Sequence, residues 1–165
     1  MTMRTTMVSL CISTTAIAGE AAFAANASAQ DMKPVEAALR YVREIVADEH
    51  AQARLVLDGD PLGDHPALAP DILESARRTM GFEAGRLDAL LSCLPEPQWP
   101  KICSLPDDTV VVRMSPPALD GARGEVEVAW WHNSGRTVQL VWYKLELTRG
   151  AEGWYVSKVL GRGAS

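Results

Sequence analysis

The spacing of apolar residues changes on either side of a proline-rich segment, residues 94–102, and this change constrains the fold most strongly. Before the segment, apolar residues recur every three or four positions, as on one face of a helix. We expect a first helix from Pro34 to about His50, with a continuation through Leu57 left open, and shorter helical pieces from Pro70 up to Cys93 that Gly81 interrupts. After the segment, every second residue is apolar, which is typical of strands.

Four strands are expected in the second half, over residues 110–114, 126–130, 137–148 and 154–160. Turn-forming sequences separate them, such as the Arg149–Gly153 segment RGAEG. Helices followed by a meander predict an α+β fold, in which N-terminal helices pack on a curved antiparallel sheet of about four strands.

This order of elements resembles the nuclear transport factor two-like (cystatin-like) superfamily. The closing segment VQLVWYKLELTRGAEGWYVSKVL carries the resemblance, because Trp154 follows the turn and begins the last strand, as in the closing hairpin of that family. The resemblance covers most of the chain from residue 30 onward. It implies helices that enclose a conical pocket against the sheet. The superfamily holds isomerases, cyclases, epoxide hydrolases, binding modules and exported domains, so the resemblance implies a fold and not a reaction.

The N-terminus has the layout of a secretory signal peptide. Arg4 precedes a short apolar stretch, residues 7–18, and two small-x-small sites follow it, so cleavage is expected after Ala24 or Ala29. The stretch is too short for a membrane span, which needs about 20 residues. A lipoprotein signal at Cys11 is disfavoured because Leu10 precedes it, and an N-terminal helix of a cytosolic protein is the other alternative.

Two cysteines, Cys93 and Cys103, remain after the expected cleavage. In an oxidising compartment they predict a disulfide that closes the proline-rich loop. A zinc site is disfavoured because no histidine lies near them, and a redox pair because the Cys-x-x-Cys spacing is absent.

The chain has 16 basic and 21 acidic residues, a net charge of −5 and no basic run. We therefore expect no nucleic-acid partner, because basic side chains that neutralise phosphates supply most of the affinity for nucleic acid. It holds no GxSxG, HExxH, Walker or GxGxxG motif, and no nucleotide cofactor is expected. The acidic stretch DGDPLGDH, residues 58–65, begins like a calcium loop, but Pro61 and Leu62 break the pattern. We expect a solvated loop there and no metal site.

The segment VAWWHNSG, residues 128–135, holds two tryptophans and a histidine before an expected turn. A three-residue turn, Asn133–Gly135, would place Trp130 opposite Val138 on the face of the sheet that forms the core. By the same register Val126 lies opposite Trp142, which is therefore also expected in the core.

Trp131, Tyr143 and Val141 then share the other, partly wet face, which is the predicted ligand or partner surface. His132 is expected to be exposed at the turn, opposite Arg136, and without a catalytic role.

An isomerase-like site would need a carboxylate and a hydroxyl donor in an apolar cone. Tyr41 and Asp88 lie on helical segments that could approach such a cone, but no catalytic role is transferred to them.

We therefore predict an exported protein, periplasmic or secreted, with a signal peptide (1–29) and a single α+β domain (30–165). Its expected role is a non-catalytic module that binds a small apolar ligand or another envelope protein, without cofactor and without a membrane span in the mature chain. A small pocket enzyme of the isomerase, cyclase or epoxide-hydrolase type is one alternative. A structural domain that forms a homodimer through the Trp131 and Tyr143 face is the other.

Overall fold

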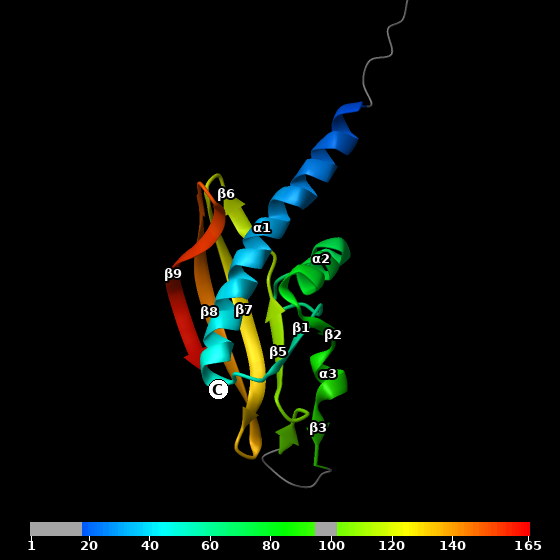
Figure 1. Cartoon of the computed structure of the whole chain (residues 1–165). Helices are drawn as coiled ribbons and strands as arrows, with labels where there is room; N and C mark the ends of the chain where they lie inside the picture. The colour runs from blue at the N-terminus through cyan, green and yellow to red at the C-terminus, as the bar shows by residue number, and fades with distance from the viewer. Residues whose placement is uncertain (1–17, 95–101) are drawn as a thin grey trace, which may run out of the picture.

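The computed structural model describes residues 18–94 and 102–165, with side chains from residue 34 onward. Three helices and nine strands occur in these ranges (Figure 1): α1 (Ala18–Glu49), β1 (Arg54–Asp58), α2 (Pro70–Met80), β2 (Glu83–Gly85), α3 (Leu87–Leu90), β3 (Ser92–Cys93), β4 (Cys103–Ser104), β5 (Thr109–Met114), β6 (Ala118–Asp120), β7 (Arg123–Ser134), β8 (Thr137–Gly150) and β9 (Gly153–Ala164). None of the described helices is long and apolar enough to cross a membrane.

The main sheet confirms the α+β class but differs from the expected meander. It has seven strands in the order β2-β1-β5-β7-β8-β9, with β6 paired to β7. Strand β1 runs parallel to β2 and β5, and the remaining pairs are antiparallel, so the sheet is mixed rather than four-stranded and antiparallel. The prediction missed β1 because Val56 and Leu57, on opposite faces of the sheet, are both buried. Such a short run of apolar residues does not alternate, so its sequence pattern does not distinguish a strand from a helix.

Helix α1 ends at Glu49, as expected, and does not continue through Leu57. It begins at Ala18 rather than near Pro34, which lies inside it. Both predicted cleavage sites therefore fall in the N-terminal part of α1, and residues 1–17 lie outside the described part of the chain. Both sites precede Pro34 and Val35, the first residues whose side chains are described, and these two side chains are buried.

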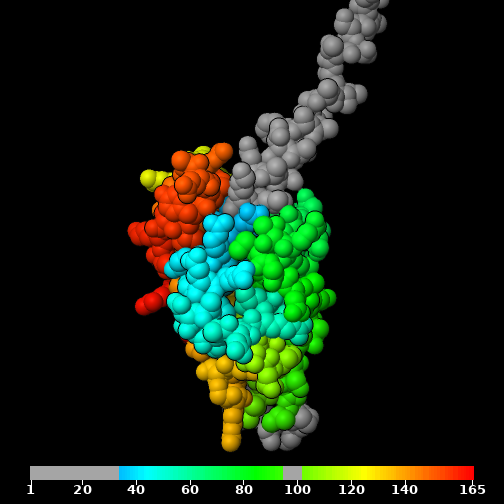
Figure 2. All heavy atoms as spheres, in the orientation of Figure 1, coloured from blue at the N-terminus to red at the C-terminus, as the bar shows by residue number. Residues whose placement is uncertain are grey.

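Helices α1 and α2 lie side by side across one face of the sheet, which we call the inner face (Figures 1 and 2). The main core lies between them and the sheet. It is built from Val35, Ala38, Leu39, Val42 and Val46 of α1, Ile72, Leu73, Ala76 and Met80 of α2, and Val110, Val112, Met114, Val126, Val128, Trp130, Leu145 and Leu147 of the strands.

The register of the β7–β8 hairpin corrects the sequence-based prediction. Ser134 pairs with Thr137, so the turn has two residues, Gly135 and Arg136, and not three. Gly135 has a φ of 64°, as a tight hairpin turn of this kind requires. Trp130 consequently pairs with Val141 instead of Val138. Moving the pairing by three residues, an odd number, exchanges the two faces of β8.

The side chains of β8 therefore face opposite to the prediction. Tyr143 and Val141 lie on the inner face and pack against the main core, whereas Trp142 lies on the outer face and is 42% exposed. Leu145 and Leu147 are fully buried in the same core. The predicted surface of Trp131, Tyr143 and Val141 is therefore not one face: only Trp131 lies on the outer side of the sheet.

The outer face is covered over one half only. Leu87 of α3 and Leu105 pack on Val56 and Val111 there, forming a second, smaller core that Trp131 borders. The outer face of β7, β8 and β9 beyond Trp131 has no helix over it in the described part of the chain.

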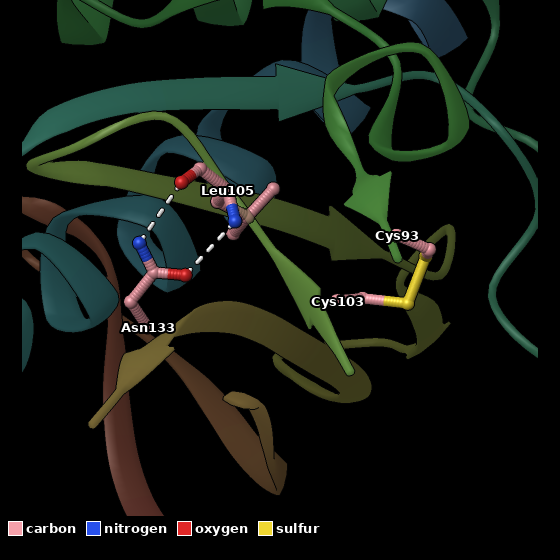
Figure 3. The surroundings of a disulfide bond; sticks show 4 residues. All are labelled: Cys93, Cys103, Leu105 and Asn133. Carbon is pink, nitrogen blue, oxygen red and sulfur yellow. Dashed lines mark hydrogen bonds between the residues drawn. A yellow bond between two sulfur atoms is a disulfide. The ribbon is translucent and has the colours of Figure 1, made fainter. Parts of the chain in front are cut away.

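The predicted disulfide between Cys93 and Cys103 is confirmed, and it joins the short strands β3 and β4 (Figure 3). The loop between them, 95–101, lies outside the described residues. Asn133 fastens the same segment to the hairpin: its side-chain amide donates to Leu105 O (2.9 Å) and its carbonyl oxygen accepts from Leu105 N (2.8 Å).

Replacing both cysteines with serine should lower the free energy of unfolding by about 2–3 kcal/mol, because the bridge restricts a short loop in the unfolded chain. Urea denaturation of the oxidised protein and of the double variant measures the difference. A thiol assay on non-reduced protein is the control, and two free thiols would contradict the bridge.

Candidate functional site

A groove of about 520 Å³ lies on the open half of the outer face. Its apolar lining comes from Ala129 and Trp131 of β7 and from Leu140 and Trp142 of β8. The loop Leu62–His65 and the side chain of Glu127 form its polar wall. A hollow of this size, with apolar rings and a few polar groups at the edge, has the usual character of a small-molecule site.

Trp131 stands at the boundary between the covered and the open halves of the outer face. It packs against the smaller core, and the Arg113 guanidinium lies 5.4 Å from the centre of its ring. This cation–π contact and the packing hold the Trp131 ring toward β5.

Trp142 leans the other way, toward β9. Its indole lies over Gly161 and Gly163, where a Cβ on Gly163 would collide with the indole nitrogen. The two glycines thus provide the space for the ring, and Trp142 remains 42% exposed. Between the two splayed indoles, Ala129 and Leu140 line the groove.

The loop wall of the groove is anchored by Asp58, which is 2% exposed. Its Oδ2 accepts hydrogen bonds from Leu87 N (2.7 Å) and from Nε and Nη2 of Arg113 (2.8 and 2.6 Å). Its Oδ1 accepts from Asp60 N (2.9 Å) and so turns the chain at the start of the loop. The expectation of a solvated acidic stretch is therefore wrong for Asp58, which is buried because these donors replace water.

The hydrogen bonds also decide the charge state of Asp58. Burial by itself would raise the pKa of this carboxyl, but the backbone N–H groups of Leu87 and Asp60 and the Arg113 guanidinium favour the charged form. The net result is a lowered pKa. Asp58 is thus a charged anchor and is unsuited to act as a general acid.

At the far end of the same stretch, His65 Nε2 lies 3.4 Å from Glu127 Oε2 and links the loop to the sheet across the groove wall. The described residues contain no group of three or more side chains that could hold a metal ion.

His132 is not exposed, in contrast to the prediction. It lies opposite Gln139 rather than Arg136, its ring is on the inner face and it is 8% exposed. The ring centre lies 4.7 Å from that of His50 at the end of α1. Both imidazoles line a polar pocket of about 260 Å³ together with Glu49 and Asp108.

The surroundings of His132 favour its neutral form. Burial lowers its pKa, and the neighbouring His50 lowers it further, while the Asn133 carbonyl and Glu49 oppose this in part. Nδ1 lies 3.2 Å from Asn133 O, which can only accept, so Nδ1 carries the proton of the neutral ring.

Tyr41 and Asp88 are not brought together. Tyr41 lies on the inner side, where its ring contacts Tyr143 edge to face at 6.4 Å. Asp88 is exposed on α3 and pairs with Arg86 at 3.1 Å. No cone that holds both of them is formed.

Sequence reasoning missed Trp142 and Leu140 as groove residues because the turn length was misjudged. A usable signal was present in the last strand: the motif Gly161-Arg162-Gly163 places two glycines two residues apart, which in a strand marks a close approach by a neighbouring group.

Comparisons with protein-family models and with curated proteins find no match to this chain. Among solved structures, a sugar N-methyltransferase from a Streptoalloteichus species matches with 12% identity over 98% of this chain and 83% of that chain. Its TM-score is 0.22, which is too low to support a conclusion about fold or activity.

Asp58→Asn should lower the free energy of unfolding at pH 7 by about 3 kcal/mol, because it leaves the partly buried Arg113 guanidinium without its main partner. Since the folded-state pKa is lowered, the contribution of Asp58 is present above its ordinary pKa of about 3.9 and is lost as the pH falls through the folded value. Urea denaturation at several pH values measures both effects. Asp88→Asn on exposed α3 is the matched control, and an equal loss in that variant would contradict the assignment.

The burial of His132 predicts a second pH dependence. Its folded-state pKa lies below the ordinary value of about 6.5, so the unfolded chain binds more protons between the two values and stability falls as the pH drops through this window. Thermal unfolding between pH 8 and pH 5 should show this slope, and His132→Gln should reduce it. An unchanged slope in His132→Gln would refute the prediction.

Proposed function

We propose that this protein is an exported, non-catalytic binding module that holds a small molecule with a flat apolar face in the groove between Trp131 and Trp142. One observation carries the proposal: Trp142, which is 42% exposed, lines an apolar hollow of about 520 Å³. A contiguous apolar surface that is rimmed by polar groups is the usual mark of a binding site in a globular protein.

A small ligand is favoured over a protein partner by the form of the groove. Loop Leu62–His65 rises beside the sheet and makes a walled hollow, whereas protein interfaces are mostly broad and flatter. The mixed rim, with Asp64, His65 and Glu127, can orient polar substituents of the ligand.

The enzymatic alternative receives no support from the described residues. Asp58 is their one buried carboxylate, and its pKa is lowered rather than raised. An isomerase-like base or acid would need a carboxyl with a raised pKa beside a donor.

Export, to the periplasm or outside the cell, is part of the proposal. It rests on the N-terminal layout and on the Cys93–Cys103 disulfide, since such bridges persist in oxidising compartments. N-terminal sequencing of protein from the producing cell tests it: a chain that begins at residue 25 or 30 is expected, and a thiol-reduced, uncleaved chain would contradict it.

We also propose membership of the nuclear transport factor two-like superfamily. The proposal is supported by α1 lying across the strongly bulged β8–β9 hairpin on one face of the sheet. A crystal structure of the mature domain that superposes on members over most of its length is the expected result, and superposition on another fold would refute it.

Mass spectrometry of material that co-purifies with the mature protein tests the binding proposal. A small molecule should be recovered with the unaltered protein and lost with Trp142→Ala, because stacking on one aromatic ring contributes about 1 kcal/mol or more. Gly163→Ala should also weaken binding, since its Cβ displaces the Trp142 indole.

Tyr155→Ala is the matched control, because Tyr155 is an exposed aromatic residue of β9 that does not line the groove. Equal recovery from Trp142→Ala and from the control would refute the site. A dimer in solution scattering that becomes a monomer in Trp131→Ala would favour the structural alternative instead.

A further inference from the structure

A second hollow, of about 450 Å³, lies on the inner side between α1 and the edge strand β9. Tyr41 and Ile45 of α1, Tyr143 of β8 and residues Val159–Arg162 of β9 line it. We call it the α1–β9 cleft. Tyr143 is stacked on the buried Trp130 with ring centres 5.1 Å apart, so one wall of the cleft is fixed to the main core.

Two irregularities in the β8–β9 pairing bring Arg162 into this cleft. Leu145 pairs with Val159 but Lys144 pairs with Gly161, so β9 holds one extra residue, Leu160, at this point. A second extra residue, Ser157, lies between the partners of Glu146 and Leu147. Such bulges reverse the alternation of a strand. Arg162 consequently pairs with Tyr143 and shares its inner face, whereas strict alternation from Val159 would have turned it outward.

The cleft contains three hydrogen-bond donors, one of them on the exposed residue Arg162, that have no protein acceptor among the described residues. Within the described part of the chain, neither the Tyr41 nor the Tyr143 hydroxyl forms a hydrogen bond, and Arg162 forms no ion pair. No carboxylate lines the cleft. Burial and the neighbouring Tyr143 raise the pKa of Tyr41, with a smaller opposing effect of Arg162, so this phenol stays protonated at neutral pH.

We propose that the α1–β9 cleft binds a small amphipathic carboxylate. Arg162 and the two phenols donate to the carboxylate oxygens, and the apolar part of the ligand lies along Ile45 and Val159. A single guanidinium without an ion-pair partner matches one negative charge, and a guanidinium and phenols are donors of the kind that carboxylates accept. This site lies on the other side of the sheet from the outer groove, because Tyr143 and Arg162 are paired on the inner face whereas Trp131 and Trp142 lie on the outer face.

Octanoate is the probe, and octylamine and acetate are the comparison ligands. Each is titrated into the protein, and binding is measured from the amide chemical shifts of Gly161 and Arg162 and by calorimetry. Octanoate should bind saturably, with a dissociation constant of about 1 mM or below. Octylamine should bind far more weakly because its charge is repelled by Arg162, and acetate because it lacks the apolar chain.

Arg162→Gln should weaken octanoate binding by about tenfold or more, as expected for a charge-assisted hydrogen bond. Tyr41→Phe and Tyr143→Phe remove one hydroxyl each, keep the packing, and should each weaken binding severalfold. Lys158→Gln is the matched control, since Lys158 lies on the same strand, pairs with Glu146 and is turned to the outer face.

The proposal is overturned if octanoate shows no saturable shifts up to about 10 mM. It is also overturned if octylamine or acetate binds as tightly as octanoate, or if Arg162→Gln and Lys158→Gln bind equally well.

Discussion

The buried carboxylate of Asp58 joins three segments that are distant in the sequence: the end of β1, the start of α3 and the end of β5. It accepts from Leu87 N and from the Arg113 guanidinium, so the parallel edge of the sheet and the cover over half of its outer face are fixed by one charged group. Arg113 in turn lies over the ring of Trp131. The covered half of the outer face therefore ends at Trp131, and the open groove begins there.

The two-residue turn at Gly135-Arg136 is the second constraint on the site. It assigns Tyr143 and Val141 to the inner side and Trp142 to the outer side, where Gly161 and Gly163 make room for the ring. The aromatic residues of one hairpin thus serve two different hollows. Trp131 and Trp142 line the outer groove, and Tyr143, supported by Trp130, lines the α1–β9 cleft.

The hollows differ in chemistry because different elements close them. The outer groove is walled by an acidic loop and floored by small and apolar side chains, which suits a flat apolar ligand with polar edges. The α1–β9 cleft combines phenols and one guanidinium with aliphatic walls, which suits an amphipathic anion. The pocket of His50 and His132 is polar, and burial of the His132 imidazole lowers its pKa and so links stability to pH.

Several features of this protein are determined by the sequence alone. The change of apolar spacing predicts helices before a sheet, the inward face of α1 follows from Val35, Leu39 and Val42, and Cys93 and Cys103 are paired as expected. Periodicity reports which side chains of one strand share a face, but not which residues lie opposite them. Adding or removing one residue in a turn or a bulge, as at Gly135 and Leu160, changes which residues pair across two strands. The free energy that selects one pairing over another comes from packing between segments that are distant in the sequence. The tertiary structure alone therefore decided that β1 is a strand, that Asp58 is an anchor, and which of the aromatic and cationic side chains meet in each hollow.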